Sequence, residues 1–226
     1  MCEKCGRRKK YGSKQWCRPC ILVWQRESEG KAKEFSGTIS DDCRLDDVIP
    51  ERFRDARIEN LPDAIRKATE ALPDDMGLFL WGPPGVGKTY SLCAIARKLY
   101  SDGWDVKRTT WDMLCLKIRN TFGGGGSELH IVESMVNVDK LLIEDVGVTV
   151  SIGQIESDFS LRTLLVILDN RLEHCRATYI SSNKSVEELG KSFDTRIASR
   201  LQQACQVIKL EGQDKRKPEN GVTRKD

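Results

Sequence analysis

The 226-residue chain lacks long apolar runs. None of its segments reaches the roughly 18 consecutive apolar residues of a membrane-spanning helix. The first residues, Met-Cys-Glu-Lys-Cys-Gly, do not form the charged and then apolar segment of a secretory signal. We therefore expect a soluble, cytoplasmic protein with no membrane partner, in which the nine cysteines remain reduced.

The net charge is also small, at only +3, but the charged residues are unevenly distributed along the chain. The first 33 residues contain ten Lys and Arg against three Glu, so the rest of the chain is weakly acidic. The basic character therefore belongs to the N-terminal end.

Four of the cysteines form two C-x2-C pairs separated by eleven residues. Each pair places two thiolates on one tight turn, and two such turns complete a tetrahedral Zn²⁺ site. A redox-active C-x-x-C is the alternative for either pair alone, but it is rarely doubled over so short a distance. We therefore predict a zinc-ribbon-like module over residues 1–29, with Zn²⁺ bound by Cys2, Cys5, Cys17 and Cys20.

Basic and aromatic side chains alternate around these cysteines, for example Arg8, Lys10, Tyr11 and Trp16. Such a mixture suits a nucleic-acid strand, because phosphates take the charge and bases stack on the rings. It also suits a minimal core whose cations offset the negative metal site, or a surface that docks a protein. The module therefore has three open interpretations.

A phosphate-binding loop follows an apolar segment of strand length, residues 78–81. Residues 82–89 fit G-x-x-x-x-G-K-[ST], and the next apolar positions have helical spacing. The glycines let backbone N–H groups point at phosphates, Lys88 reaches the outer phosphates, and the Thr89 hydroxyl ligates Mg²⁺. The expected ATP contacts are Gly82, Pro83, Pro84, Gly85, Val86, Gly87, Lys88, Thr89 and Tyr90.

The remaining segments indicate an α/β core. Residues 30–47 are polar and read as a linker, so the core is expected over 48–210. Within it we predict an amphipathic helix before the loop, a strand at 105–110 and a helix after that strand. The glycine run at 123–126 is expected to be a loop, because glycine is entropically costly inside regular elements.

Two carboxylates end a second apolar strand, at Glu144 and Asp145. Downstream of a phosphate-binding loop, one such acid holds Mg²⁺ and its neighbour polarises the attacking water. We assign Mg²⁺ to Thr89 and Glu144. A third strand ends at Asn183, whose amide would sense the outer phosphate, although Asn is also common where a strand enters a turn.

Arg196 and Arg200 lie four residues apart and share one face of a predicted helix. They form either a solvated basic face or a catalytic group that enters the ATP site of a neighbouring subunit. In the second case, hydrolysis requires assembly of several copies.

These motifs together resemble the AAA+ ATPases of the DnaC/DnaI helicase-loader and IstB transposition-helper group. Residues 82–89 are similar to its Walker A motif, 141–147 to its Walker B motif and 178–183 to sensor 1. Ser199-Arg200-Leu201 is similar to its arginine-finger segment. The resemblance implies a P-loop NTPase core with a parallel sheet flanked by helices.

The sequence departs from the family pattern in the order Glu144-Asp145, where Asp is usual in the first position. The longer side chain moves the first carboxylate by about 1 Å, which can slow hydrolysis. After residue 210 only the polar segment 211–226 remains, which we expect to be a disordered tail. It leaves no room for a C-terminal helical lid, as in the loader group.

The resemblance implies an ATP-dependent loader that assembles with ATP, binds a hexameric replicative helicase and places it on single-stranded DNA. One alternative is an IstB-like helper that acts on duplex DNA with a transposase. Another is an adaptor that binds ATP but hydrolyses it weakly. A monomeric P-loop kinase fits less well, because paired acids and late arginines suit hydrolysis and assembly.

Overall fold

The computed structural model describes residues 45–124, 126–147 and 158–216. The predicted zinc module at 1–29, with its four cysteine ligands, lies outside the described residues. So do most of the predicted linker and residues 217–226 of the predicted tail.

A five-stranded parallel sheet with the order β2-β3-β4-β1-β5 forms the centre of the protein. The apolar run before the phosphate-binding loop and the run that ends in the paired acids both become buried strands of this sheet, as predicted, and one other strand separates them. The edge strand β5 was not predicted, and much of it is exposed. The strands are β1 Gly77–Trp81, β2 Val106–Thr110, β3 Lys140–Glu144, β4 Thr178–Ser182 and β5 Cys205–Lys209.

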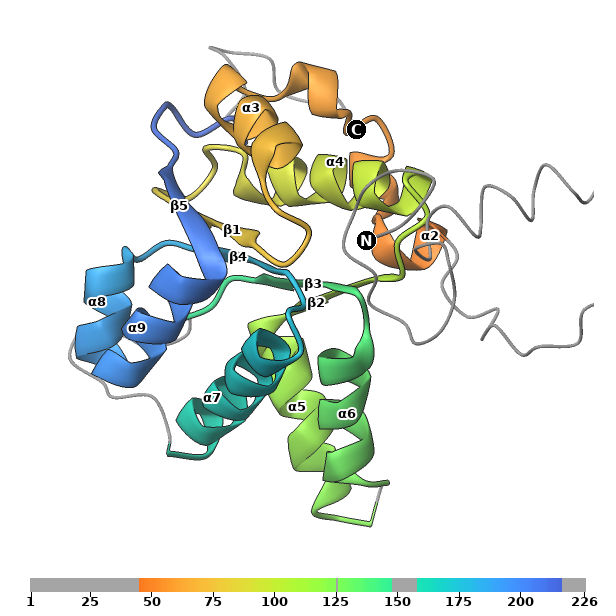
Figure 1. Ribbon diagram of the computed structural model, residues 1–226, viewed down its shortest axis with the longest axis vertical. Coiled ribbons are helices and arrows are strands. Elements are labelled where there is room, and N and C mark those ends of the chain that lie inside the picture. Colours follow the sequence, from red (N-terminus) through yellow and green to blue (C-terminus); the bar gives the residue numbers. More distant parts are fainter. Residues whose placement is uncertain (1–44, 125, 148–157, 217–226) are drawn as a thin grey trace, which may run out of the picture.

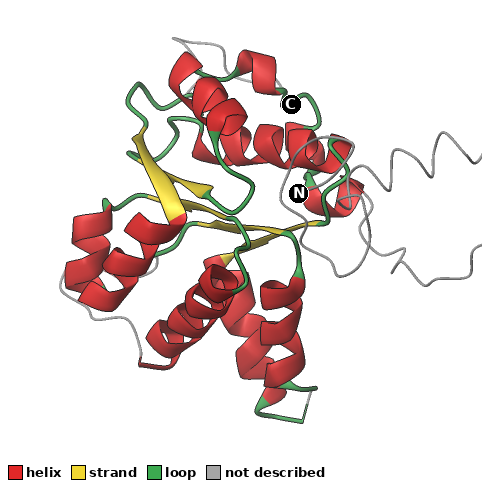
Figure 2. Cartoon of the chain, viewed as in Figure 1, coloured by secondary structure: helices red, strands yellow, loops and turns green. Residues whose placement is uncertain are grey.

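Helices cover both faces of this sheet, as Figures 1 and 2 show. One face carries α3 (Asp63–Ala71) and α4 (Lys88–Ser101), with the short α2 (Leu45–Val48), η1 (Glu51–Phe53) and η2 (Ile58–Asn60) nearby. The other face carries α5 (Trp111–Thr121), α6 (Glu128–Asn137), α7 (Asp158–Glu173), α8 (Val186–Ser192) and α9 (Thr195–Ala204). Within the described residues no helix follows β5, and none of the helices has the length and apolarity to cross a membrane.

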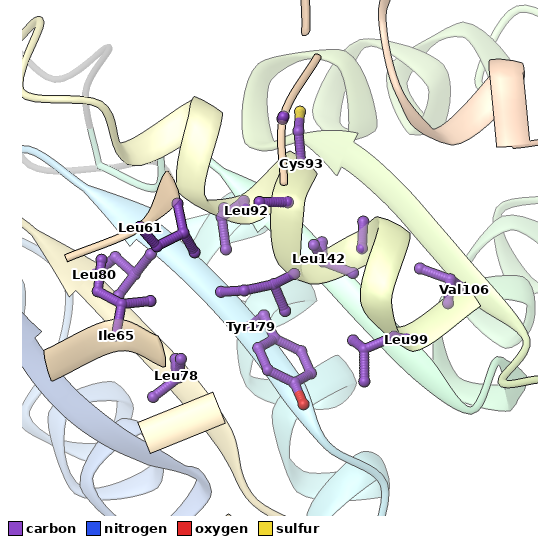
Figure 3. Close-up of a cluster of buried hydrophobic side chains, with 14 of the residues drawn as sticks. Leu61, Ile65, Leu78, Leu80, Leu92, Cys93, Leu99, Val106, Leu142 and Tyr179 are labelled. Carbon is purple, nitrogen blue, oxygen red and sulfur yellow. The ribbon is translucent and has the colours of Figure 1, made fainter. Parts of the chain in front are cut away.

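Strand alternation divides the buried side chains into two cores. Successive residues of a strand point to opposite faces, so each buried strand contributes to both. The core under α3 and α4 receives Leu78, Leu80, Leu142 and Tyr179 (Figure 3). The core under α5–α9 receives Phe79, Leu141, Ile143 and Ile180. The continuous apolar runs in the sequence are explained by burial on both sides.

Hydroxyl side chains start several of the helices. The Thr110 hydroxyl accepts a hydrogen bond from the Met113 backbone and starts α5, while Ser127 starts α6 in the same way. Ser185 and Glu188 form a reciprocal capping box at α8. The predicted glycine loop falls between α5 and α6, whereas α6 and α8 themselves were not predicted.

Arg171 of α7 holds together the entry points of two strands. Its fully buried guanidinium donates to the carbonyl oxygens of Val138 at 2.8 Å and Ala177 at 2.6 Å, and to the Thr178 hydroxyl at 2.9 Å. It donates further to the carbonyls of Met135, Val136 and Asp139. The planar guanidinium thus donates to a group of backbone acceptors before β3 and β4, of which the carbonyls of Val136 and Ala177 also have a second donor.

Candidate nucleotide-binding site

The carboxyl ends of β1, β3 and β4 meet at one edge of the sheet. β1 lies beside β4, yet β1 continues into α4 on one face and β4 into α8 on the other. In open parallel sheets, ligands bind in the crevice where neighbouring strands diverge in this way. The fold therefore brings the predicted loop, acids and strand-end amide to one place.

Left-handed backbone conformations shape the loop between β1 and α4. Gly85 has φ 80° and Gly87, the residue before α4, has φ 104°, values that side chains rarely allow. The Lys88 ammonium lies within the loop and donates to the carbonyl oxygens of Gly82 at 2.7 Å and Pro83 at 2.8 Å. Burial lowers the pKa of Lys88; Asp145 counteracts this and Arg216 adds to it. The cation is therefore held beside the start of α4, where the helix dipole also favours an anion.

Glu144, the last residue of β3, is buried with only 2 % of its surface exposed. Its carboxylate accepts a hydrogen bond from Arg108 Nε of β2, with which it forms an ion pair, and it also hydrogen-bonds to the Thr89 hydroxyl. Burial raises the pKa of Glu144, while Arg108 and Thr89 counteract that rise. The carboxylate that we predict to hold Mg²⁺ is therefore paired with the Arg108 guanidinium of the same chain.

Asp145 has φ 57°, one of the two left-handed non-glycine conformations among the described residues. Its backbone N–H donates to the Ser181 hydroxyl of β4 at 3.2 Å, and the Ser182 hydroxyl donates to the Val146 carbonyl at 2.7 Å. Backbone strain of this kind is often found at functional positions. The turn aims Asp145 out of β3 and ties it to β4.

The end of β4 also reaches the loop. The Gly82 backbone N–H donates to the Ser182 carbonyl at 3.3 Å, so the loop begins directly beside this strand end. Asn183, which follows Ser182, is half-buried. Lys88, Glu144, Asp145 and Asn183 are thereby gathered at one edge of the sheet.

Thr89 and Glu144 provide a hydroxyl and a carboxylate that lie close enough for the hydroxyl to lower the pKa of Glu144. Both are oxygen ligands of the kind that Mg²⁺ prefers, so the residues fit the metal. When bound, Mg²⁺ would neutralise charge on the phosphates. Arg108 competes for the same carboxylate, and sequence reasoning missed it.

The two candidate finger arginines lie on α9. The Arg200 guanidinium forms an ion pair with Asp169 of α7, and Arg196 pairs with Asp194 at 2.8 Å with 72 % of its side chain exposed. Both groups are accessible from solvent and are held by single carboxylates. Their assignment as arginine fingers stays a prediction.

Sequence reasoning missed two features of the site, the position of Arg108 and the course of segment 210–216. Arg108 could have been noticed from strand register, because Thr110 pairs with Glu144 and Arg108 lies two residues earlier on the same face of β2. The segment 210–216 runs back along the loop, and no sequence pattern indicates this. Within the described parts of the chain, no three His, Cys, Asp or Glu residues cluster as a metal site.

The strand order, the loop after β1 and the buried acid at the end of β3 define a P-loop nucleotide-binding core of the AAA+ class. The sequence model of the family described as IstB-like ATP binding protein matches residues 68–221. The chain belongs to this ATP-binding family.

Curated relatives include the replicative helicase loader DnaC of Escherichia coli K12, 28 % identical over 156 residues that make up 66 % of this chain and 62 % of DnaC. The loader DnaI of Bacillus subtilis is 23 % identical over 75 % of this chain and 57 % of DnaI. The chain thus spans about three fifths of the length of each relative. A crystal structure of the DnaC helicase loader has a TM-score of 0.62 at 18 % identity, covering 71 % of this chain and 99 % of that one, which supports the fold.

Proposed function

We propose that this protein is an ATP-dependent loader that binds a hexameric replicative helicase and places it on single-stranded DNA. The observation that carries the proposal is the match to two curated replicative helicase loaders over most of the present chain. The gathered loop, acids and amide support a core that binds ATP.

In this proposal the residues at the sheet edge bind and hydrolyse ATP. Lys88 leaves the loop carbonyls and binds the outer phosphates, and Thr89 and Glu144 are the residues that would hold Mg²⁺. Asp145, aimed out of β3 by its left-handed turn, polarises the attacking water, and Asn183 orients it. In the present arrangement the Glu144 carboxylate that would hold Mg²⁺ is paired with Arg108.

Hydrolysis further depends on assembly. Arg200, and Arg196 beside it, would enter the ATP site of the next copy and stabilise charge in the transition state. This can be tested by mixing Arg200→Ala, which keeps its own ATP site, with Lys88→Ala, which keeps its arginine. Each variant alone is expected to be inactive in ATP hydrolysis, whereas the mixture should recover part of the DNA-stimulated hydrolysis. If the mixture recovers no hydrolysis, Arg200 does not act in the ATP site of a neighbouring subunit.

The decisive test of the loader proposal is the native mass of the protein mixed with its host's replicative helicase. With ATP, the wild-type chain is expected to form a complex several subunits heavier than the helicase hexamer. Lys88→Ala should weaken that complex, whereas the matched exposed variant Lys67→Ala should not. The same mixture should load the helicase on a single-stranded circle, measured as unwinding of an annealed strand.

If no complex forms with or without ATP, the loader proposal fails. ATP-dependent binding of duplex DNA together with a transposase would then identify the IstB-like helper. We further propose that the N-terminal zinc module binds the helicase or the DNA.

The contact of Arg108 with Glu144 favours a second candidate, an adaptor that binds ATP but scarcely hydrolyses it. Glu144 is longer than the aspartate usual at this position, and its carboxylate is bound to the Arg108 guanidinium. Both features disfavour the placement of the carboxylate that rapid ATP hydrolysis requires. Under this candidate, hydrolysis stays negligible in the wild type with DNA and rises in Glu144→Asp. Turnover at the rate usual for AAA+ ATPases in the wild type would exclude the adaptor.

A further inference from the structure

The segment that follows β5 returns along the phosphate-binding loop instead of leaving the core (Figure 1). The Leu210 backbone N–H donates to the Trp81 carbonyl at 2.7 Å, which extends the pairing of β5 with β1 to the point where the loop begins. Further on, the Lys215 backbone N–H donates to the Gly85 carbonyl at 3.0 Å. The segment 210–216 is thus attached to the loop at both of its ends.

Glycine makes this close approach possible. A Cβ atom on Gly82 would lie 2.1 Å from the Leu210 carbonyl oxygen, and one on Gly85 would lie 1.7 Å from Asp214 Oδ1. Both contacts are far shorter than any real Cβ contact, so these positions exclude a side chain for packing reasons in addition to their backbone conformation. The glycines of the motif therefore serve the C-terminal segment as well as the loop.

The segment also brings positive charge to the loop. The Lys215 ammonium lies beside Gly87, 3.8 Å from where a Cβ would be. Arg216 is near enough to Lys88 to lower the pKa of that lysine. Asp214 accepts a hydrogen bond from the Arg216 backbone at 3.0 Å and partly offsets the charge. Neither basic side chain forms an ion pair with a described residue.

Three cations thus converge on a loop whose backbone is shaped to receive an anion. The positive charges of these three side chains repel one another, and this repulsion disfavours the position of segment 210–216 beside the loop. A bound polyanion would neutralise the charges and remove the repulsion. The backbone bond from Lys215 to Gly85 instead holds the segment in place. A triphosphate at the loop would satisfy Lys88, Lys215 and Arg216 together.

We propose that segment 210–216 forms a second wall of the ATP site, and that Lys215 and Arg216 bind the phosphates of the nucleotide. This proposal rests on ATP binding by the loop and adds two ligands from a part of the chain that the sequence indicates to be a tail. Both side chains are exposed, so their replacement leaves the core intact.

The test is calorimetric titration of the full chain with ATP and with ADP at two salt concentrations. In Lys215→Ala/Arg216→Ala, affinity for ATP is expected to fall at least about tenfold, with a weaker dependence on salt. The conservative exchange Lys215→Arg/Arg216→Lys should keep most of the affinity. The matched control removes two exposed charges of α5, Lys117→Ala/Arg119→Ala, and should change affinity less than about twofold.

Each outcome distinguishes between the possibilities. Affinity equal to that of the α5 control refutes the proposal while leaving the ATP site of the loop in place. Tighter ATP binding in the double variant also refutes it, because the segment would then be an obstacle that the nucleotide must displace. If the wild-type chain binds no ATP at all, the site itself fails, and with it the proposed loader.

Discussion

The ion pair between Arg108 and Glu144 allows a quantitative test of how the site is built. The pair joins neighbouring strands, with Glu144 2 % exposed and the Arg108 side chain 14 % exposed. The perturbation is a double-mutant cycle of Arg108→Met, Glu144→Gln and the two together. Methionine keeps most of the buried volume and removes the charge, while glutamine keeps the shape of glutamate.

The magnitudes follow from burial. Removing Arg108 leaves a buried carboxylate with only the Thr89 hydroxyl as a partner, which is expected to cost about 4 kcal/mol of unfolding free energy. Glu144→Gln keeps a hydrogen-bond acceptor for Arg108 and should cost about 2 kcal/mol. The double variant has no buried charge left, so we expect about 4 kcal/mol rather than the sum, a coupling of about 2 kcal/mol.

The assay is urea unfolding at several pH values. Burial raises the folded-state pKa of Glu144, and loss of Arg108 removes a counteracting cation, so that pKa rises further in Arg108→Met. The folded state then binds more protons than the unfolded state, and stability falls as pH rises above the unfolded pKa. Arg108→Met should therefore lose stability between about pH 5 and pH 7 more steeply than the wild type.

Two results would refute this reasoning. A coupling below about 0.5 kcal/mol would mean that the two side chains are independent. An Arg108→Met variant with the pH dependence of the wild type would mean that Glu144 is already protonated or solvated. Arg119→Met, exposed on α5, controls for the substitution itself and is expected to change stability by less than about 0.5 kcal/mol.

Two other predictions concern the fold and the metal. Arg171→Met should destabilise the protein by about 3–5 kcal/mol in urea unfolding, because six buried acceptors each lose a hydrogen bond from the guanidinium. Arg162→Met, exposed on the same helix, should change stability by less than about 0.5 kcal/mol, and equal losses in the two variants would contradict the stabilising role of the Arg171 hydrogen bonds. Freshly purified protein is expected to contain one zinc per chain, lost in Cys17→Ser but kept in the exposed control Cys175→Ser, with ATP binding nearly unchanged. Metal analysis that finds no zinc in the wild type would rule the site out.

The nucleotide loop and the strands around it were predictable because their signals are local. A glycine-rich motif between an apolar run and a helical pattern needs only contiguous residues to be recognised. The same holds for the acids at the end of β3, whose buried strand is apolar on both faces. The edge strand β5 gave no such signal, because residues such as Gln206 face solvent and its structure comes from pairing with β1.

The sequence by itself therefore determined the class of the core, the phosphate-binding loop and the identity of the strand-end acids. Tertiary structure alone decided that Arg108 binds Glu144 and that Lys215 lies against the loop, contacts that join residues far apart in the chain. Pairing of this kind depends on strand order, register and the direction in which the chain leaves the last strand. These are set by packing of the whole sheet, and local patterns do not contain them.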